Sequence, residues 1–135
     1  MIGIDDPREL PGYKKKSFIL PFNGGEIWCE HLDGIYGNED LVLQKLAGDL
    51  PLFTRPSSTS CIAVAVAETV LTDNIINALV SAFTNTAKKF TRVAFIGADS
   101  YSKRLLWKKL KNCGFAVKFI DDFEKAKEWL VSEKY

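Results

Sequence analysis

The stretch that decides the fold is residues 61–90, which we expect to form one buried strand, CIAVAVA at residues 61–67, that runs straight into one long helix, TDNIINALVSAFTNTAKKF at residues 72–90. The first seven residues are all apolar, which is typical of a central strand covered on both faces. In the second stretch, apolar side chains recur every three or four residues and form one stripe along a helix: Ile75, Ile76, Leu79, Val80, Phe83 and Ala87. The side-chain oxygen of Thr72 or Asp73 can cap this helix. With a further apolar strand at residues 92–96, the stretch predicts half of an α/β sandwich.

Upstream of this stretch, the sequence predicts a β-hairpin. Apolar runs at residues 18–22 and 26–32 flank Asn23-Gly24-Gly25, a glycine-rich loop of a length that suits two antiparallel strands. Pro21 has no N–H to donate to a ladder, so we expect the first strand at an edge of the sheet. A helix should follow from Asn38 to Gly48, with a loop from residue 50 to residue 60.

Downstream, a third helix should begin near Asp99 or Ser100 and stop at Gly114. Its expected buried side chains are Tyr101, Leu105, Leu106, Leu110 and Cys113. Residues 115–120 alternate as a half-buried strand, and Asp121 with Glu124 has the spacing of a capping box at the start of a last helix. The predicted fold class is therefore α/β, with a mixed four- to five-stranded sheet and about four helices. Residues 1–16 form an N-terminal tail, mobile or loosely docked, and residues 17–135 a single domain.

Composition narrows the function classes. The 135 residues are 47% apolar and 26% charged with a net charge of +1, as in an ordinary globular domain and unlike a dedicated nucleic-acid binder. No run approaches the roughly 20 apolar residues of a membrane span, and residues 1–16 lack the apolar core of a signal peptide. We therefore expect a cytoplasmic protein. We interpret the basic side chains of the third helix as a solvated face rather than a nucleic-acid site: Lys103, Arg104, Lys108, Lys109 and Lys111.

The sequence predicts no catalytic, metal or cofactor site. Cys29, Cys61 and Cys113 are an odd number of cysteines with long spacings, which favours three reduced and mostly buried thiols. His31 is the single histidine and has no evident acid or nucleophile to work with, so we expect that the chain is not an enzyme.

In their order, four motifs resemble the STAS domain (sulfate transporter and anti-sigma-factor antagonist) in its small soluble bacterial form. Leu32-Asp33-Gly34 resembles the family's turn before its first helix, and residues 62–79 occupy the place of its signature strand, loop and helix. Residues 92–97 resemble the next strand with its terminal glycine, and residues 119–130 the final strand and helix. The resemblance covers nearly the whole chain from residue 17 onward and implies the STAS-like sandwich fold.

The resemblance also implies a role in binding proteins. Antagonists of this family present Asp-Ser-Ser-Gly at the start of the second helix, where a partner kinase phosphorylates a serine. The residues at the corresponding positions of this chain are Thr72, Asp73, Asn74 and Ile75, so neither serine is present. We therefore expect a protein-interaction module with these four residues as partner contacts and without the phosphoserine. The alternative is a module of the same fold that binds a small apolar ligand or a lipid, with Trp28, Trp107 and Trp129 as possible pocket residues, although such aromatic residues are more often core.

Overall fold

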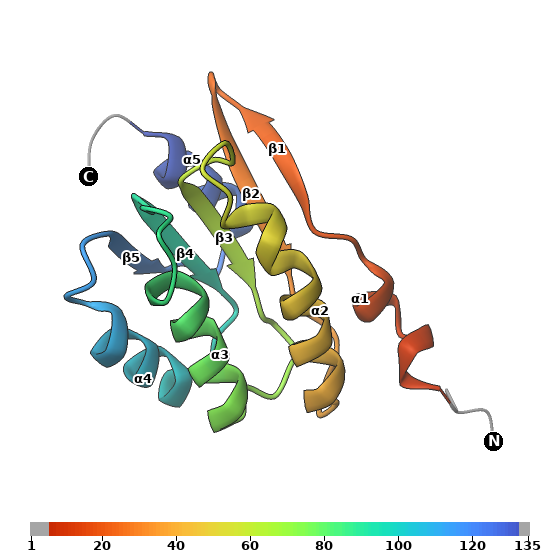
Figure 1. Cartoon of the computed structure of the whole chain (residues 1–135). Helices are drawn as coiled ribbons and strands as arrows, with labels where there is room; N and C mark the ends of the chain where they lie inside the picture. The colour runs from red at the N-terminus through yellow and green to blue at the C-terminus, as the bar shows by residue number, and fades with distance from the viewer. Residues whose placement is uncertain (1–5, 133–135) are drawn as a thin grey trace.

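A five-stranded mixed sheet forms the centre of the chain, in a computed structural model that describes residues 6–132 (Figure 1). The strand order β1-β2-β3-β4-β5 is also the chain order. β1 and β2 are antiparallel, and the remaining neighbours are parallel. The strands are β1 (Phe18–Phe22), β2 (Gly25–His31), β3 (Cys61–Ala65), β4 (Arg92–Ile96) and β5 (Ala116–Phe119). The predicted α/β class and mixed sheet are confirmed, and β3 is central as expected.

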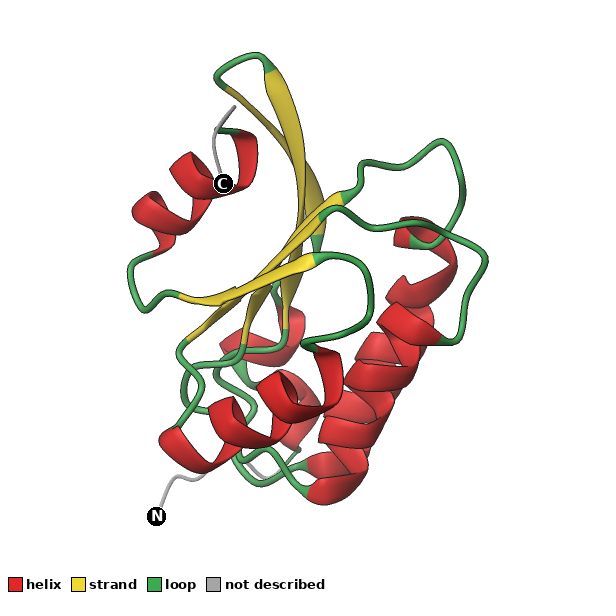
Figure 2. Cartoon of the chain, turned by 90° about the vertical axis from the view of Figure 1, so that its left-hand side faces the viewer, coloured by secondary structure: helices red, strands yellow, loops and turns green. Residues whose placement is uncertain are grey.

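Helices cover both faces of the sheet (Figure 2). The four longer helices are α2 (Glu39–Phe53), α3 (Asp73–Thr84), α4 (Ser100–Leu110) and α5 (Phe123–Val131). The first three lie on one face, where Ile62, Val64 and Phe95 belong to the larger apolar core. α5 covers the other face and packs on β2, β3 and β4. Because β3 is covered on both sides, its residues can be apolar throughout, as the sequence suggested.

The hairpin turn explains why Pro21 is tolerated. Asn23 and Gly24 have φ values of 46° and 83°, as a two-residue type I′ turn requires. Such a turn is closed by a hydrogen-bonded pair of residues, here Phe22 with Gly25. In the next pair, Pro21 with Glu26, the backbone N–H and C=O groups point away from the partner strand. Pro21 therefore faces away from β2, where no ladder bond is lost, and the predicted edge position of β1 is confirmed.

Two expected helix ends are wrong. α2 continues through Gly48 and Pro51 to Phe53, and α3 ends at Thr84 rather than running to Phe90. Phe53 is fully buried against Trp28, Phe83 and Phe90, at ring-centroid distances of 5.9, 6.0 and 6.3 Å. This packing outweighs the local preference of glycine and proline for ending a helix. Phe90 reaches the same cluster from a loop.

Other expectations about the later elements need correction. A connection at residues 66–72 separates β3 from α3, so the helix does not follow the strand at once. Tyr101 and Cys113 are exposed rather than inward, since α4 ends at Leu110 and its buried face follows Ser102, Leu106 and Leu110. Asp122, and not Asp121, caps α5 by accepting from the N–H groups of Glu124 and Lys125. Among the three thiols, only that of Cys29 is fully buried.

The described part of the expected tail is docked on the domain, while residues 1–5 lie outside the described residues. This part consists of a 3₁₀ turn (Pro7–Glu9) and α1 (Pro11–Lys14), and α1 packs on α2. A Cβ at Gly12 would lie 2.3 Å from the carbonyl oxygen of Asp33, so only glycine fits this contact. Lys15 Nζ lies 2.9 Å from Asp33 Oδ2 and adds an ion pair. The segment therefore packs in one specific position against the loop after β2.

Candidate functional site

Thr72 is the N-cap of α3. Its Oγ1 accepts a hydrogen bond from the N–H of Ile75 at 3.2 Å, so the cap is Thr72 and not Asp73. The same hydroxyl donates to Oε1 of Glu39 in the first turn of α2. This bond joins the N-termini of two helices. It also occupies the hydroxyl group that a kinase would have to reach at this position.

Two loops at the carboxyl ends of β2 and β3 lie directly before these helices and are bonded to each other. Thr69 Oγ1 donates to the carbonyl of Leu32 at 2.6 Å and accepts from the N–H of Ile35 at 3.1 Å. The N–H of Val70 donates to the carbonyl of Tyr36 at 2.9 Å. The loops therefore form one continuous edge that presents Tyr36 and Val70 in fixed positions.

Tyr36 and Glu68 hold unusual backbone conformations on this edge. Their φ values are 55° and 56°, in the left-handed region that residues other than glycine seldom adopt. The hydroxyl of Tyr36 donates to Glu68 Oε2 at 3.0 Å, and this bond raises the pKa of Tyr36. Strained residues that face solvent are more frequent at binding sites than elsewhere.

Large apolar side chains are exposed around the start of α3. Tyr36, Val70 and Tyr101 are 51%, 57% and 56% exposed. Asp73 and Tyr101 line the same shallow groove of about 300 Å³ between α3 and α4. We call this region the carboxyl-edge surface and define it by these residues: Tyr36, Glu68, Val70, Asp73, Asn74 and Tyr101.

The structure separates the four residues expected to contact a partner. Asp73 and Asn74 are exposed in the first turn of α3. Thr72 is half-buried with its hydroxyl engaged, and the Ile75 side chain is fully buried in the core. Tyr36, Glu68 and Val70 were missed because nothing in their sequence context marks them as exposed.

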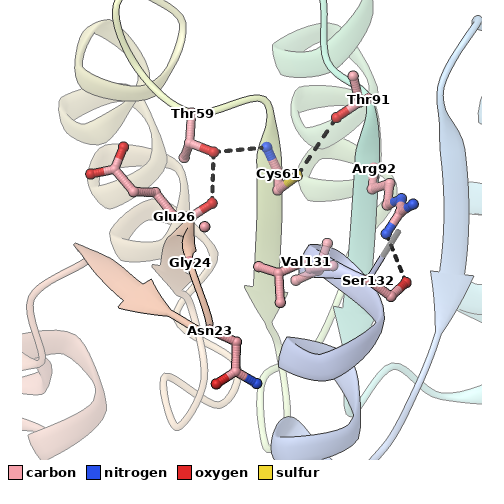
Figure 3. Close-up of a pocket in the computed structure, with 11 residues that line it drawn as sticks. Asn23, Gly24, Glu26, Thr59, Cys61, Thr91, Arg92, Val131 and Ser132 are labelled. Atoms are coloured by element: carbon pink, nitrogen blue, oxygen red, sulfur yellow. Dashed lines mark hydrogen bonds between the residues drawn. The ribbon is translucent and has the colours of Figure 1, made fainter. Parts of the chain in front are cut away.

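A polar pocket of about 430 Å³ lies at the opposite end of the sheet, between the amino ends of β3 and β4 and the end of α5 (Figure 3). Its polar groups bond one another. Thr59 Oγ1 donates to the carbonyl of Glu26 at 2.7 Å, and Cys61 Sγ lies 3.6 Å from Thr91 Oγ1. Arg92 donates to Ser132 Oγ at 3.0 Å and lies over the ring of Trp129. These contacts have a structural role in joining the strands to α5, and none of them places a basic side chain next to the Cys61 thiol.

A second pocket at the amino end of the sheet, of about 670 Å³, has aromatic walls. Phe83, Phe90 and Phe115 contribute these walls, with Phe83 and Phe90 in an edge-to-face contact at 5.2 Å. Lys89 stands exposed beside them. None of the three tryptophans lines this pocket, since Trp28 lies in the core and Trp107 on the outside of α4.

Glu30 is a buried acid between β2 and α2. Glu30 is only 1% exposed, and its Oε1 accepts a hydrogen bond from Trp28 Nε1 at 2.8 Å. Burial, together with the neighbouring carboxyl group of Asp49, raises the pKa of Glu30 to about 9. Among the described residues, Oε2 of Glu30 is buried without a hydrogen bond, and a charge on this carboxyl would be poorly solvated, which favours its neutral form. Lys45 Nζ lies 3.9 Å from Asp49, and burial lowers its pKa.

His31 does have an acidic neighbour, which sequence reasoning missed. Its Nδ1 lies 3.3 Å from Asp33 Oδ1, and its ring stacks on Phe18 at 5.7 Å. Burial alone would raise the pKa of Asp33, but hydrogen bonds from His31 and Lys15 outweigh it and hold that pKa well below the ordinary value. The described residues contain no group of three side chains that could hold a metal ion. Within residues 6–132, no helix is both long and apolar enough to cross a bilayer.

No protein-family model matches the chain, and no curated protein sequence matches it significantly.

Proposed function

We propose that this chain is a non-enzymatic protein-interaction module, similar to an anti-sigma-factor antagonist but without a phosphorylatable serine. The observation that carries the proposal is the carboxyl-edge surface. There, Tyr36 and Val70 expose apolar area on two loops that are bonded to each other, and Tyr101 exposes its ring in the first turn of α4. Exposed aromatic residues on a rigid support are common anchors of protein interfaces.

The charges on this surface indicate the kind of partner. Glu68 and Asp73 stand between the apolar residues, and Asp73 lies in the first turn of α3, where a fixed negative charge is favourable. A partner segment that combines apolar with basic side chains complements this arrangement. The three free thiols agree with the reducing conditions of the cytoplasm.

Alanine substitution in a purified complex tests the proposal. A partner recovered by chemical crosslinking should lose at least tenfold in affinity when Tyr101 or Val70 is changed to Ala. Lys125→Ala, on the exposed side of α5, is the matched control and should leave the affinity unchanged. Equal affinities for all three variants would contradict the assignment of this surface.

The aromatic pocket supports a second candidate function, the binding of a small apolar ligand or lipid. Its volume lies in the range of ligand sites, and its three phenylalanine walls are suited to an apolar molecule. Organic extraction of purified protein followed by mass spectrometry should then recover a ligand at close to one equivalent. Phe115→Trp, which fills the pocket, should abolish its recovery, while Tyr101→Ala should not. An empty extract from the unmodified protein would exclude this function.

A further inference from the structure

The outer face of α4 combines basic side chains with an exposed tryptophan. Arg104, Trp107, Lys108 and Lys111 follow each other at intervals of three, one and three residues, so they form one stripe along the helix. Trp107 stands in the middle of the stripe and is 49% exposed. α4 is the outermost helix on its side of the sheet (Figure 1), and this stripe faces away from the core.

The positive charge of this face is not balanced locally. Between residues 100 and 120 the chain has six basic residues and no acidic one: Lys103, Arg104, Lys108, Lys109, Lys111 and Lys118. In the described part of the chain, Lys103 has an ion pair with Asp121 at 3.7 Å, and Lys109 shares a groove with Asp73. Arg104, Lys108 and Lys111 have no acidic ion-pair partner among residues 6–132. Since the whole chain carries only +1, this is a local concentration of charge.

Helix stability explains part of this pattern only. Lys108 and Lys109 stand in the last turn of α4, where positive charge interacts favourably with the helix dipole. That effect gives no reason for Arg104 in the middle of the helix or for a large indole ring left in water. Lys89 is a further exposed basic residue, and it lines the aromatic pocket together with Cys113 and Phe115, which follow α4 in the chain.

We propose that the outer face of α4 docks on an anionic phospholipid surface. Lys and Arg side chains attract acidic headgroups, and Trp is the side chain that prefers the boundary between headgroups and acyl chains. The stripe lies on the convex outer surface of a helix, with Trp107 midway along it and the exposed ring of Tyr101 one turn before Arg104. A nucleic-acid strand is instead bound by a groove with several stacking rings in succession. The geometry thus fits a planar array of phosphates with Trp107 inserted between the headgroups.

Vesicle co-sedimentation of the full chain tests this inference. Vesicles of phosphatidylcholine with 30% phosphatidylserine should bind the protein at low salt, and vesicles of phosphatidylcholine alone should not. Each basic residue at such a surface contributes about fivefold in the partition coefficient (about 1 kcal/mol). Arg104→Glu/Lys108→Glu should therefore weaken binding at least 25-fold, and 0.5 M salt should do the same. Trp107→Ala should weaken it with no change in net charge.

Lys16→Glu/Lys125→Glu is the matched control, since it makes the same change in net charge on α5 and beside β1, where both lysines are exposed. It should retain most of the binding, and circular dichroism should show that all variants are folded. Absence of binding to the acidic vesicles, or an equal loss in the control, would overturn the inference. Binding to a single-stranded oligothymidylate that depends on Arg104 and Lys108, without vesicle binding, would assign the face to nucleic acid instead.

Discussion

Replacement of Glu30 by Gln should stabilise the protein increasingly as the pH rises. The pKa of Glu30 is about 9 in the folded chain, against an ordinary value of 4.5. When the pKa of an acid is higher in the folded than in the unfolded protein, the acid contributes fully to stability at any pH below its pKa in the unfolded chain. This contribution is lost progressively as the pH rises from that pKa to the pKa in the folded protein. pH 7 lies 2.5 pH units above 4.5, so at pH 7 the unfolding free energy of the wild-type protein is lower by up to roughly 3 kcal/mol than it is below pH 4.5.

Gln keeps the contacts of the protonated acid. Its carbonyl can accept from Trp28 Nε1, and its amide can donate to Asp49, so the pairing between β2 and α2 survives without an ionisable group. The remaining charged groups near the pair, Lys45 of α2 and beyond it Asp33 and Lys15, are unchanged in the variant.

Urea denaturation at pH 5, 7 and 9 measures this effect. The stability difference between Glu30→Gln and wild type should be under about 1 kcal/mol at pH 5 and should grow by roughly 1 kcal/mol or more for each pH unit above it. Glu26→Gln, at an exposed position of the same strand, should show no such trend. A difference that stays constant from pH 5 to pH 9 would refute the protonated, buried state of Glu30.

Four further predictions concern α3 and the central strands. Thr72→Ala removes the cap and should lower stability by about 1 kcal/mol, whereas Thr72→Ser should retain it, both measured by urea denaturation. Asp73→Ser should reduce affinity for an identified partner while lowering stability by no more than about 1 kcal/mol, the loss of the helix-dipole interaction, because Thr72 and not Asp73 caps the helix; unchanged affinity would remove Asp73 from the binding surface. Val64→Ala, in the fully buried centre of β3, should cost about 1–3 kcal/mol by the same denaturation assay. Gly97→Ala should cost about 2 kcal/mol or more, since φ is +86° there and a new Cβ would lie 2.6 Å from that of Ala67; a normal melting temperature would show that the two loops can separate.

The order and type of the elements could be predicted because they depend on periodicity along the chain. The uniform apolar run at residues 61–67 identified the central strand, and the glycine-rich turn with Pro21 identified the edge hairpin. The ends of α2 and α3 could not be predicted, because Phe53 and Phe90 are placed by contacts with residues distant in sequence. Local rules for Gly48 and Pro51 do not include those contacts.

The candidate site was predictable only in its location on α3. From the sequence, Thr72 and Asp73 are equal candidates for the cap; in the structure Thr72 is the cap, and its hydroxyl also bonds Glu39 of another helix. The exposure of Tyr36 and Val70 depends on two loops that are bonded across a gap of more than thirty residues. Similarly, the raised pKa of Glu30 depends on the packing of α2 against β2, which periodicity does not specify.

The agreement between strand order and chain order has a consequence for synthesis of the protein. As each strand emerges from the ribosome, its sheet neighbour has already been made, and α2, α3 and α4 can cover one face as they appear. The other face has to wait for α5, which packs on three strands after all of them have been translated. Until then Ile27, Ala94 and Ile96 have no helix to cover them, so the interval before α5 is complete is the one in which the nascent chain exposes most of this apolar face.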